Sequence, residues 1–126
     1  MKLLSFYRLS VFSSILFTVL SFILMFAPVL MLSAWGVELT DSVGLVARRI
    51  AALYAGIAVM YFFARNAAHS ETRTALIVGT ITACLILAIL GVYEFATGHA
   101  SNGILVSVLI EVILILAFLY VGARKK

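Results

Sequence analysis

Four charged side chains lie inside apolar stretches of the sequence: Arg48, Arg49, Glu94 and Glu111. A helix rises about 1.5 Å per residue, which places the arginines roughly 8–10 Å inside their stretch, Glu94 roughly 5 Å and Glu111 roughly 12 Å. A charge at such depth costs of order 2–3 kcal/mol unless it is paired or hydrated. We therefore expect one ionic cluster, with the Tyr54 hydroxyl bonded to Glu111 or to a serine of the first helix.

This expected cluster has three interpretations. It could be a structural staple that fixes helix register, because buried charges are usually paired. It could be a ligand or ion site open to the outside, with Arg48 and Arg49 binding an anionic group and Glu94 and Glu111 carrying protons. In the third interpretation the arginines extend to the lipid head groups at the outer surface.

Enzymatic chemistry finds no support in the sequence. There is no evident nucleophile–base pair, and His69 and His99 have no second His or Cys at metal-ligand spacing. The single cysteine, Cys84, excludes an internal disulfide and falls within an apolar run. We expect no catalytic residue, no metal and no cofactor.

Composition places these residues in a membrane protein. Of 126 residues, 65% are hydrophobic and 11% are charged, whereas soluble domains are about half apolar and a quarter charged. The net charge of +4 comes from basic residues at the ends of apolar runs, so it does not indicate nucleic-acid binding. We predict one all-α integral membrane domain, residues 1–126.

Four apolar runs are long enough to cross a bilayer. They predict an up-down-up-down bundle of four transmembrane helices at about residues 11–32, 43–65, 72–97 and 103–122. Pro28 should kink or end the first helix. Ser70 is a good N-cap, and Gly98 suits the end of the third helix.

Basic residues predict the orientation of the helices. Seven of them lie in the three segments that an even number of spans places on the same side of the membrane: the N-terminus, the turn between the second and third spans, and the C-terminus. These residues are Lys2, Arg8, Arg65, Arg73, Arg124, Lys125 and Lys126. The positive-inside rule therefore puts both termini in the cytoplasm. The predicted location is the cell inner membrane, as a multi-pass protein.

Small residues recur at intervals of four in the second and third spans. Ala51 and Ala55 form one ridge, and Gly79 and Ala83 belong to another. Such ridges let helices approach closely, so we expect the second and third spans to pack on each other through them. Four helices cannot use every small face internally, which favours a homo-oligomer or a membrane-protein partner.

Several stretches carry a resemblance: 47–52, 63–67, Ser70 and 73–75. They resemble a group of small four-span bacterial inner-membrane proteins, and the chain is similar in size and layout to DoxX-like proteins. The resemblance implies the four-span fold and the bacterial inner membrane, and it implies no activity.

Two functions follow as expectations. The first is a non-enzymatic accessory or assembly subunit or small homo-oligomer, in contact with membrane lipids and without nucleic acid. The alternative is a transporter or binder of a small anionic or amphipathic ligand that uses the Arg/Glu cluster. A third hypothesis is an enzyme that acts on a lipid or quinone. An apolar pocket between the helices that holds lipid would favour the alternative or this enzyme, and a helical face covered by another protein would favour the accessory role.

Overall fold

The computed structural model describes residues 5–123, which form five helices and no strand. The bounds are α1 (Phe6–Phe26), α2 (Pro28–Trp35), α3 (Asp41–Ala64), α4 (Glu71–Ala96) and α5 (Ile104–Ala123). All but α2 are long and apolar enough to cross a membrane. The protein is therefore an all-α, multi-pass membrane protein, as its composition predicts.

Pro28 divides the predicted first span. Helix α1 ends at Phe26, and Pro28 is the first residue of α2, a position where its missing N–H is not needed. The first span thus covers residues 6–26 and not 11–32. The last part of that apolar run turns away as the short helix α2, which ends at Trp35 and is followed by Gly36 with φ +81°.

The other three spans begin and end within two residues of their predicted bounds. The Thr40 hydroxyl accepts a hydrogen bond from the Val43 N–H and caps α3, and Ser70 caps α4 in the same way. Gly98, with φ +86°, follows the last turn of α4 as predicted. The two hydroxyl groups give hydrogen-bond partners to backbone N–H groups at the helix starts that would otherwise be unpaired.

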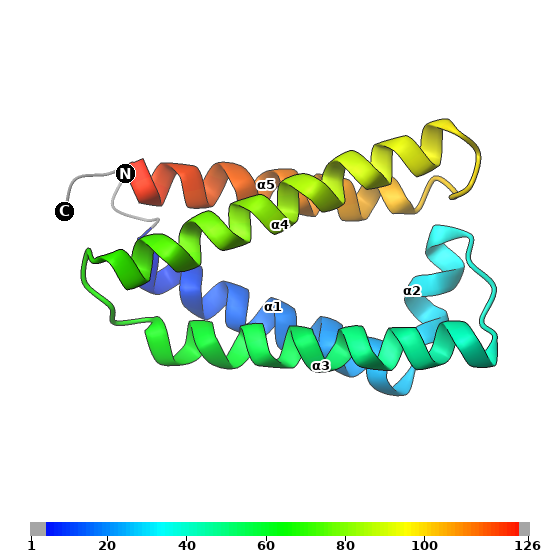
Figure 1. Cartoon of the computed structure of the whole chain (residues 1–126), viewed down its shortest axis with the longest axis horizontal. Coiled ribbons are helices and arrows are strands. Elements are labelled where there is room, and N and C mark those ends of the chain that lie inside the picture. The colour runs from blue at the N-terminus through cyan, green and yellow to red at the C-terminus, as the bar shows by residue number, and fades with distance from the viewer. Residues whose placement is uncertain (1–4, 124–126) are drawn as a thin grey trace.

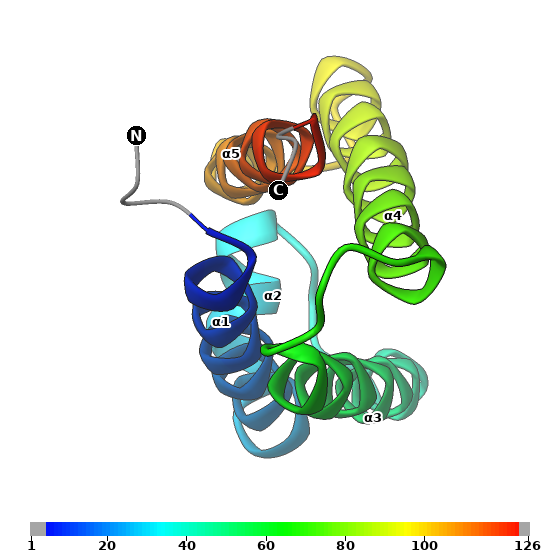
Figure 2. The same cartoon turned by 90° about the vertical axis from the view of Figure 1, so that its left-hand side faces the viewer.

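The four long helices form two antiparallel pairs, α1 with α3 and α4 with α5 (Figure 1; Figure 2 shows them end on). One end of the bundle holds the start of α1, the α3–α4 turn and the end of α5, and we call it the terminal end. The opposite end holds α2 and the α4–α5 turn, and we call it the α2 end.

Serine hydroxyls and small residues join α1 to α3. Ser21 donates a hydrogen bond to the Ala51 carbonyl (2.7 Å), and Ser14 donates one to the Ala58 carbonyl (2.9 Å). Ala51 and Ala58 are buried, so no large side chain separates the two backbones. This close approach is typical of helices in lipid, where small and hydroxyl residues fill the contact.

In the α4–α5 pair, the buried residues of α4 include Cys84, Ala88 and Gly91. Gly91 is required for this contact, because a Cβ there would lie 2.6 Å from Cγ2 of Val108. The buried residues of α5 are Leu114, Phe118 and Val121.

The predicted packing of the second span on the third is wrong. Ala51 faces α1, and Gly79 has no atom within 4 Å of the position of a Cβ. Helices α3 and α4 separate as they leave their turn (Figure 1). The physical reason is that α1 gives α3 hydroxyl donors along its length, Ser14 and Ser21, whereas the contact of α3 with α4 through Tyr61 lies near their shared turn.

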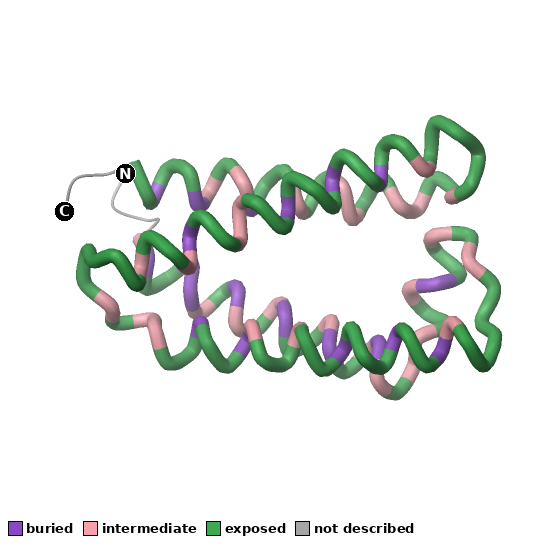
Figure 3. The backbone as a smooth tube through the Cα atoms, viewed as in Figure 1, coloured by how far each residue is buried: buried purple, intermediate pink, exposed green. Residues whose placement is uncertain are grey.

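The two pairs touch at both ends. At the terminal end, the Tyr61 hydroxyl donates to the Leu76 carbonyl (3.0 Å) and is hydrogen-bonded to Thr80. At the α2 end, the Ser101 N–H donates to the Trp35 carbonyl (2.9 Å), and the Trp35 ring N–H donates to the Ser107 hydroxyl (2.9 Å). Between these ties the pairs stand apart, and buried residues are confined to inward surfaces (Figure 3).

A candidate ligand cavity between the helix pairs

A cavity of about 390 Å³ lies between the two helix pairs. All four spanning helices and α2 line it. Its volume falls within the roughly 300–1,000 Å³ that is typical of small-molecule sites. Most of its wall is apolar, with Leu16, Leu20, Ile57 and Leu114 among the lining residues.

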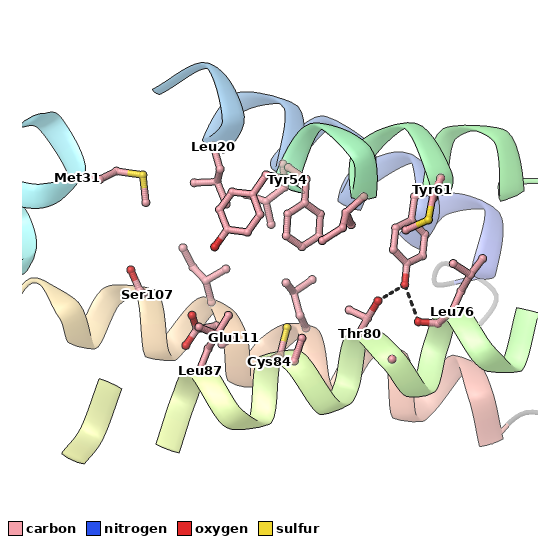
Figure 4. A pocket seen from close by; sticks show the side chains of 18 of the residues that line it. Leu20, Met31, Tyr54, Tyr61, Leu76, Thr80, Cys84, Leu87, Ser107 and Glu111 are labelled. Carbon is pink, nitrogen blue, oxygen red and sulfur yellow. Dashed lines mark hydrogen bonds between the residues drawn. The ribbon is translucent and has the colours of Figure 1, made fainter. Parts of the chain in front are cut away.

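A few polar groups enter this apolar cavity. Figure 4 shows the Tyr54 hydroxyl on one wall and the Glu111 carboxyl on the opposite wall, near Ser107. The Glu111 Oε1 atom is buried and has no hydrogen-bond partner within residues 5–123. A buried polar atom without a partner typically costs about 1–3 kcal/mol. The cavity therefore contains an acceptor that a bound molecule could satisfy.

The cavity opens between α3 and α4. Met60 of α3 and Gly79 and Ala83 of α4 line it, and all three residues are also exposed on the outside of the bundle. In a bilayer this side faces the acyl chains, so a lipid-soluble molecule could enter without crossing water.

The structure brings together two of the five predicted site residues. Tyr54 and Glu111 line the same cavity, whereas Arg48, Arg49 and Glu94 do not. Glu94 is instead hydrogen-bonded to His99, with 2.9 Å between Oε1 and Nδ1. Within the described part of the chain, neither arginine forms an ion pair with Glu94 or Glu111. The direct contacts of the predicted cluster are thus absent there.

Rotation of α3 explains this separation. Arg48 and Arg49 are exposed, while Ala47 and Ala51 on the same helix are buried against α1. The Arg48 Nη1 atom lies 3.6 Å from where a Cβ on Gly44 would stand, one turn nearer to the start of the helix. A side chain that extends toward the helix end in this way agrees with the third interpretation of the arginines.

Sequence reasoning missed two contributors to the cavity. The ridge of Ala75, Gly79 and Ala83 lines it, although the sequence predicts that this ridge packs against the second span. Trp35 of the short helix α2 also lines the cavity, and its ring N–H is bonded to Ser107. The ridge was visible in the sequence, but small side chains equally permit close packing or open space.

No group of three or more His, Cys, Asp or Glu residues that could hold a metal ion occurs within residues 5–123. Comparisons with protein-family models, with curated proteins and with solved structures find no match. The resemblance to small four-span bacterial proteins therefore stays a prediction, and the cavity is the feature of the structure that indicates a function.

Proposed function

We propose that this protein binds a small amphipathic molecule in the cavity between its helix pairs. The observation that carries the proposal is an apolar cavity of about 390 Å³ with one buried, unsatisfied carboxyl oxygen, Glu111 Oε1. The apolar part of the ligand would contact the apolar residues that line the cavity, and its one polar group would form a hydrogen bond with Glu111.

The chemistry of the cavity specifies the polar group. Glu111 offers an acceptor, and the Tyr54 hydroxyl can donate or accept. Among residues 5–123 no cationic side chain lines the cavity, so an anionic group would gain no charge partner from them. A hydroxyl or amide group on an aliphatic chain fits best. The amphipathic ligand of the expected alternative is retained, and an anionic one is not.

We further propose that the protein resides in a bacterial inner membrane with both termini in the cytoplasm. Arg8, Arg65 and Arg73 at the terminal end support this orientation. The other residues of that prediction, Lys2 and the basic residues at 124–126, lie outside the described residues. A reporter fused after Lys126 should be active only in the cytoplasm, and activity only in the periplasm would contradict the orientation.

The single tryptophan allows a direct binding test, because Trp35 lines the cavity. The probe is a long-chain alcohol with bromine on its chain, added to the purified full-length protein in detergent. Bromine quenches indole fluorescence at contact, so quenching should be saturable and reversed by the unbrominated alcohol. Quenching that rises linearly and is not reversed would contradict the proposal.

Two leucine substitutions provide the matched comparison. Gly79→Leu places a side chain in the open cavity, whereas Gly56→Leu adds the same side chain to a helix site outside it, also without an atom within 4 Å. A poor fit by a few methylenes costs roughly 10-fold or more in binding affinity. Gly79→Leu should therefore lower the affinity for the brominated alcohol, as measured by quenching, by at least about that factor. Equal effects of the two variants would contradict a specific site.

The predicted non-enzymatic accessory or oligomeric role remains a second proposal. Its supporting observation is that Ala52 and Gly56, four residues apart on α3, are exposed with open space beside Gly56. Such a pair suits close contact with another helix in lipid. Mass measurement of the protein in nanodiscs should then show a dimer or larger complex that Gly56→Leu disrupts. A monomer at all protein concentrations would contradict a homo-oligomer.

A further inference from the structure

Helices α3 and α4 form one side of the bundle, and α1 and α5 form the other (Figure 2). The cavity between the helix pairs opens on the α3–α4 side, where Met60 and Ala83 are exposed and line it. Each of the two helices also has a charged residue on this side, Arg49 on α3 and Glu94 on α4. These two residues have opposite charges.

The two charges lie at about the same level in the membrane. Arg49 precedes Met60 by eleven residues, and Glu94 follows Ala83 by eleven. Eleven residues make about three turns of an α-helix, or about 16 Å, so each charged residue shares a face with the residue at the opening. Helix α3 starts at the α2 end and α4 finishes there (Figure 1). Both charges are therefore displaced from the opening toward the α2 end.

Arg49 and Glu94 do not pair within one copy of the protein. Helices α3 and α4 separate toward the α2 end (Figure 1), and the exposed Arg49 forms no hydrogen bond or ion pair within residues 5–123. The bond of Glu94 to His99 uses Oε1, and the Glu94 side chain is 41% exposed. Charged residues inside spans are almost always paired or face water. A partner with opposite charges at this level would therefore be favourable.

A second copy of the chain has the opposite charges in the required places. In a two-fold dimer with its axis perpendicular to the membrane, a side of one copy meets the same side of the other. Helix α3 of each copy then lies against α4 of the other, so Arg49 of each copy meets Glu94 of the other. We infer, on the basis of the proposed homo-oligomer, that two copies associate through the α3–α4 side with two Arg49–Glu94 pairs between them.

The rest of this side permits close contact between helices. Gly56 lies seven residues after Arg49 on the same face of α3, and Gly79 lies one turn before Ala83 on α4. A Cβ at either glycine would meet no atom within 4 Å, and small residues let helices approach closely in lipid. The second copy would also cover the opening of the cavity, so a ligand from the lipid would enter before the copies associate.

Arg48 provides a matched control, because it has the same charge at nearly the same depth but points in another direction. Ala55 and Val59, seven and eleven residues after Arg48, line a groove between α3 and α1. Arg48 therefore lies on the α1 side of the helix and outside the inferred contact. An effect of lipid head groups on the two arginines would be similar for both, whereas the dimer contact involves Arg49 alone.

The experiment measures dimerisation by energy transfer between full-length copies with donor or acceptor dyes at the C-terminus. The copies are placed in phosphatidylcholine vesicles at decreasing ratios of protein to lipid. A polar contact between helices in a membrane is worth about threefold to thirtyfold in association. Arg49→Gln removes two such contacts, so it should weaken dimerisation by about tenfold or more, and Arg48→Gln should leave it unchanged. Equal losses in the two variants would overturn the inference.

A mixture of variants tests the pairing itself. A dimer of Arg49→Gln with Glu94→Gln keeps one Arg49–Glu94 pair, whereas a dimer of either variant with itself keeps none. Energy transfer between the two variants should therefore exceed transfer within either variant. Transfer no stronger between the variants than within them would contradict the pair. A parent protein that stays monomeric at every ratio would contradict the proposed homo-oligomer as well, whereas a parent dimer that Arg49→Gln does not weaken would overturn this contact alone.

Discussion

Substitution of Gly103 by alanine should separate α2 from the α4–α5 turn. A Cβ on Gly103 would lie 2.0 Å from the Ala34 carbonyl oxygen and 2.8 Å from its carbon. Both atoms belong to the backbone, so no side-chain rotation can relieve the overlap. The variant can fold only if the end of α2 moves away from the turn.

The cost of that movement follows from the contacts it breaks. Ser101 donates to the Trp35 carbonyl through its N–H (2.9 Å) and to the Ala34 carbonyl through its hydroxyl (2.6 Å), and Trp35 donates to Ser107 (2.9 Å). Three hydrogen bonds at about 0.6–1 kcal/mol each give a loss of roughly 2–3 kcal/mol in the free energy of unfolding.

Fluorescence and unfolding in sodium dodecyl sulfate measure the two consequences separately. Trp35 is the single tryptophan, so a shift of its emission reports the loss of its bond to Ser107 directly. The matched control is Gly56→Ala, where the added methyl group meets no atom within 4 Å. If Gly103→Ala unfolds at the same detergent fraction as Gly56→Ala and keeps the parent emission, the contact between α2 and the turn is not as described.

Three further substitutions test the fold and the cavity. Tyr61→Phe removes the hydrogen bonds between the pairs at the terminal end and should cost about 0.6–1.7 kcal/mol in the same unfolding assay; an unchanged midpoint would refute that tie. Ser21→Ala removes the bond to the Ala51 carbonyl and should cost about 0.6 kcal/mol, so a loss several times larger would mean that the hydroxyl does more than join α1 to α3. Glu111→Leu removes a buried oxygen without a partner, so it should be neutral or stabilising by up to about 1–3 kcal/mol while quenching by the brominated alcohol is lost. Strong destabilisation would instead show that Glu111 is paired, as the sequence predicted.

The sequence predicts the spanning helices well because the signal is one of length and composition. Bilayer thickness fixes how many apolar residues a span needs, and the caps Thr40 and Ser70 mark where α3 and α4 begin. The first span is the exception. A single apolar run contains both α1 and α2, and Pro28 indicates a break without indicating that the chain continues as a second helix.

The candidate site was only partly predictable, because it depends on the rotation of each helix. Depth along the helix axis was estimated from the rise per residue, and it put Arg48, Arg49, Glu94 and Glu111 at comparable levels. Depth does not say which way a side chain points. In lipid every face of a helix is apolar, so the alternation of polar and apolar residues that reveals rotation in soluble helices is lost. Only Tyr54 and Glu111 of the predicted residues therefore reach the cavity.

The arrangement as two pairs of helices also affects how the chain assembles during synthesis. Each pair consists of segments that are close in the sequence, with only α2 between α1 and α3 and a short turn between α4 and α5. Helices α1 and α3 can associate before α4 has left the ribosome, because N-terminal segments fold first. The last step is then the joining of two preformed halves, which requires few new long-range contacts. We expect a fragment that ends after the α3–α4 turn to insert in the membrane and keep its helices paired.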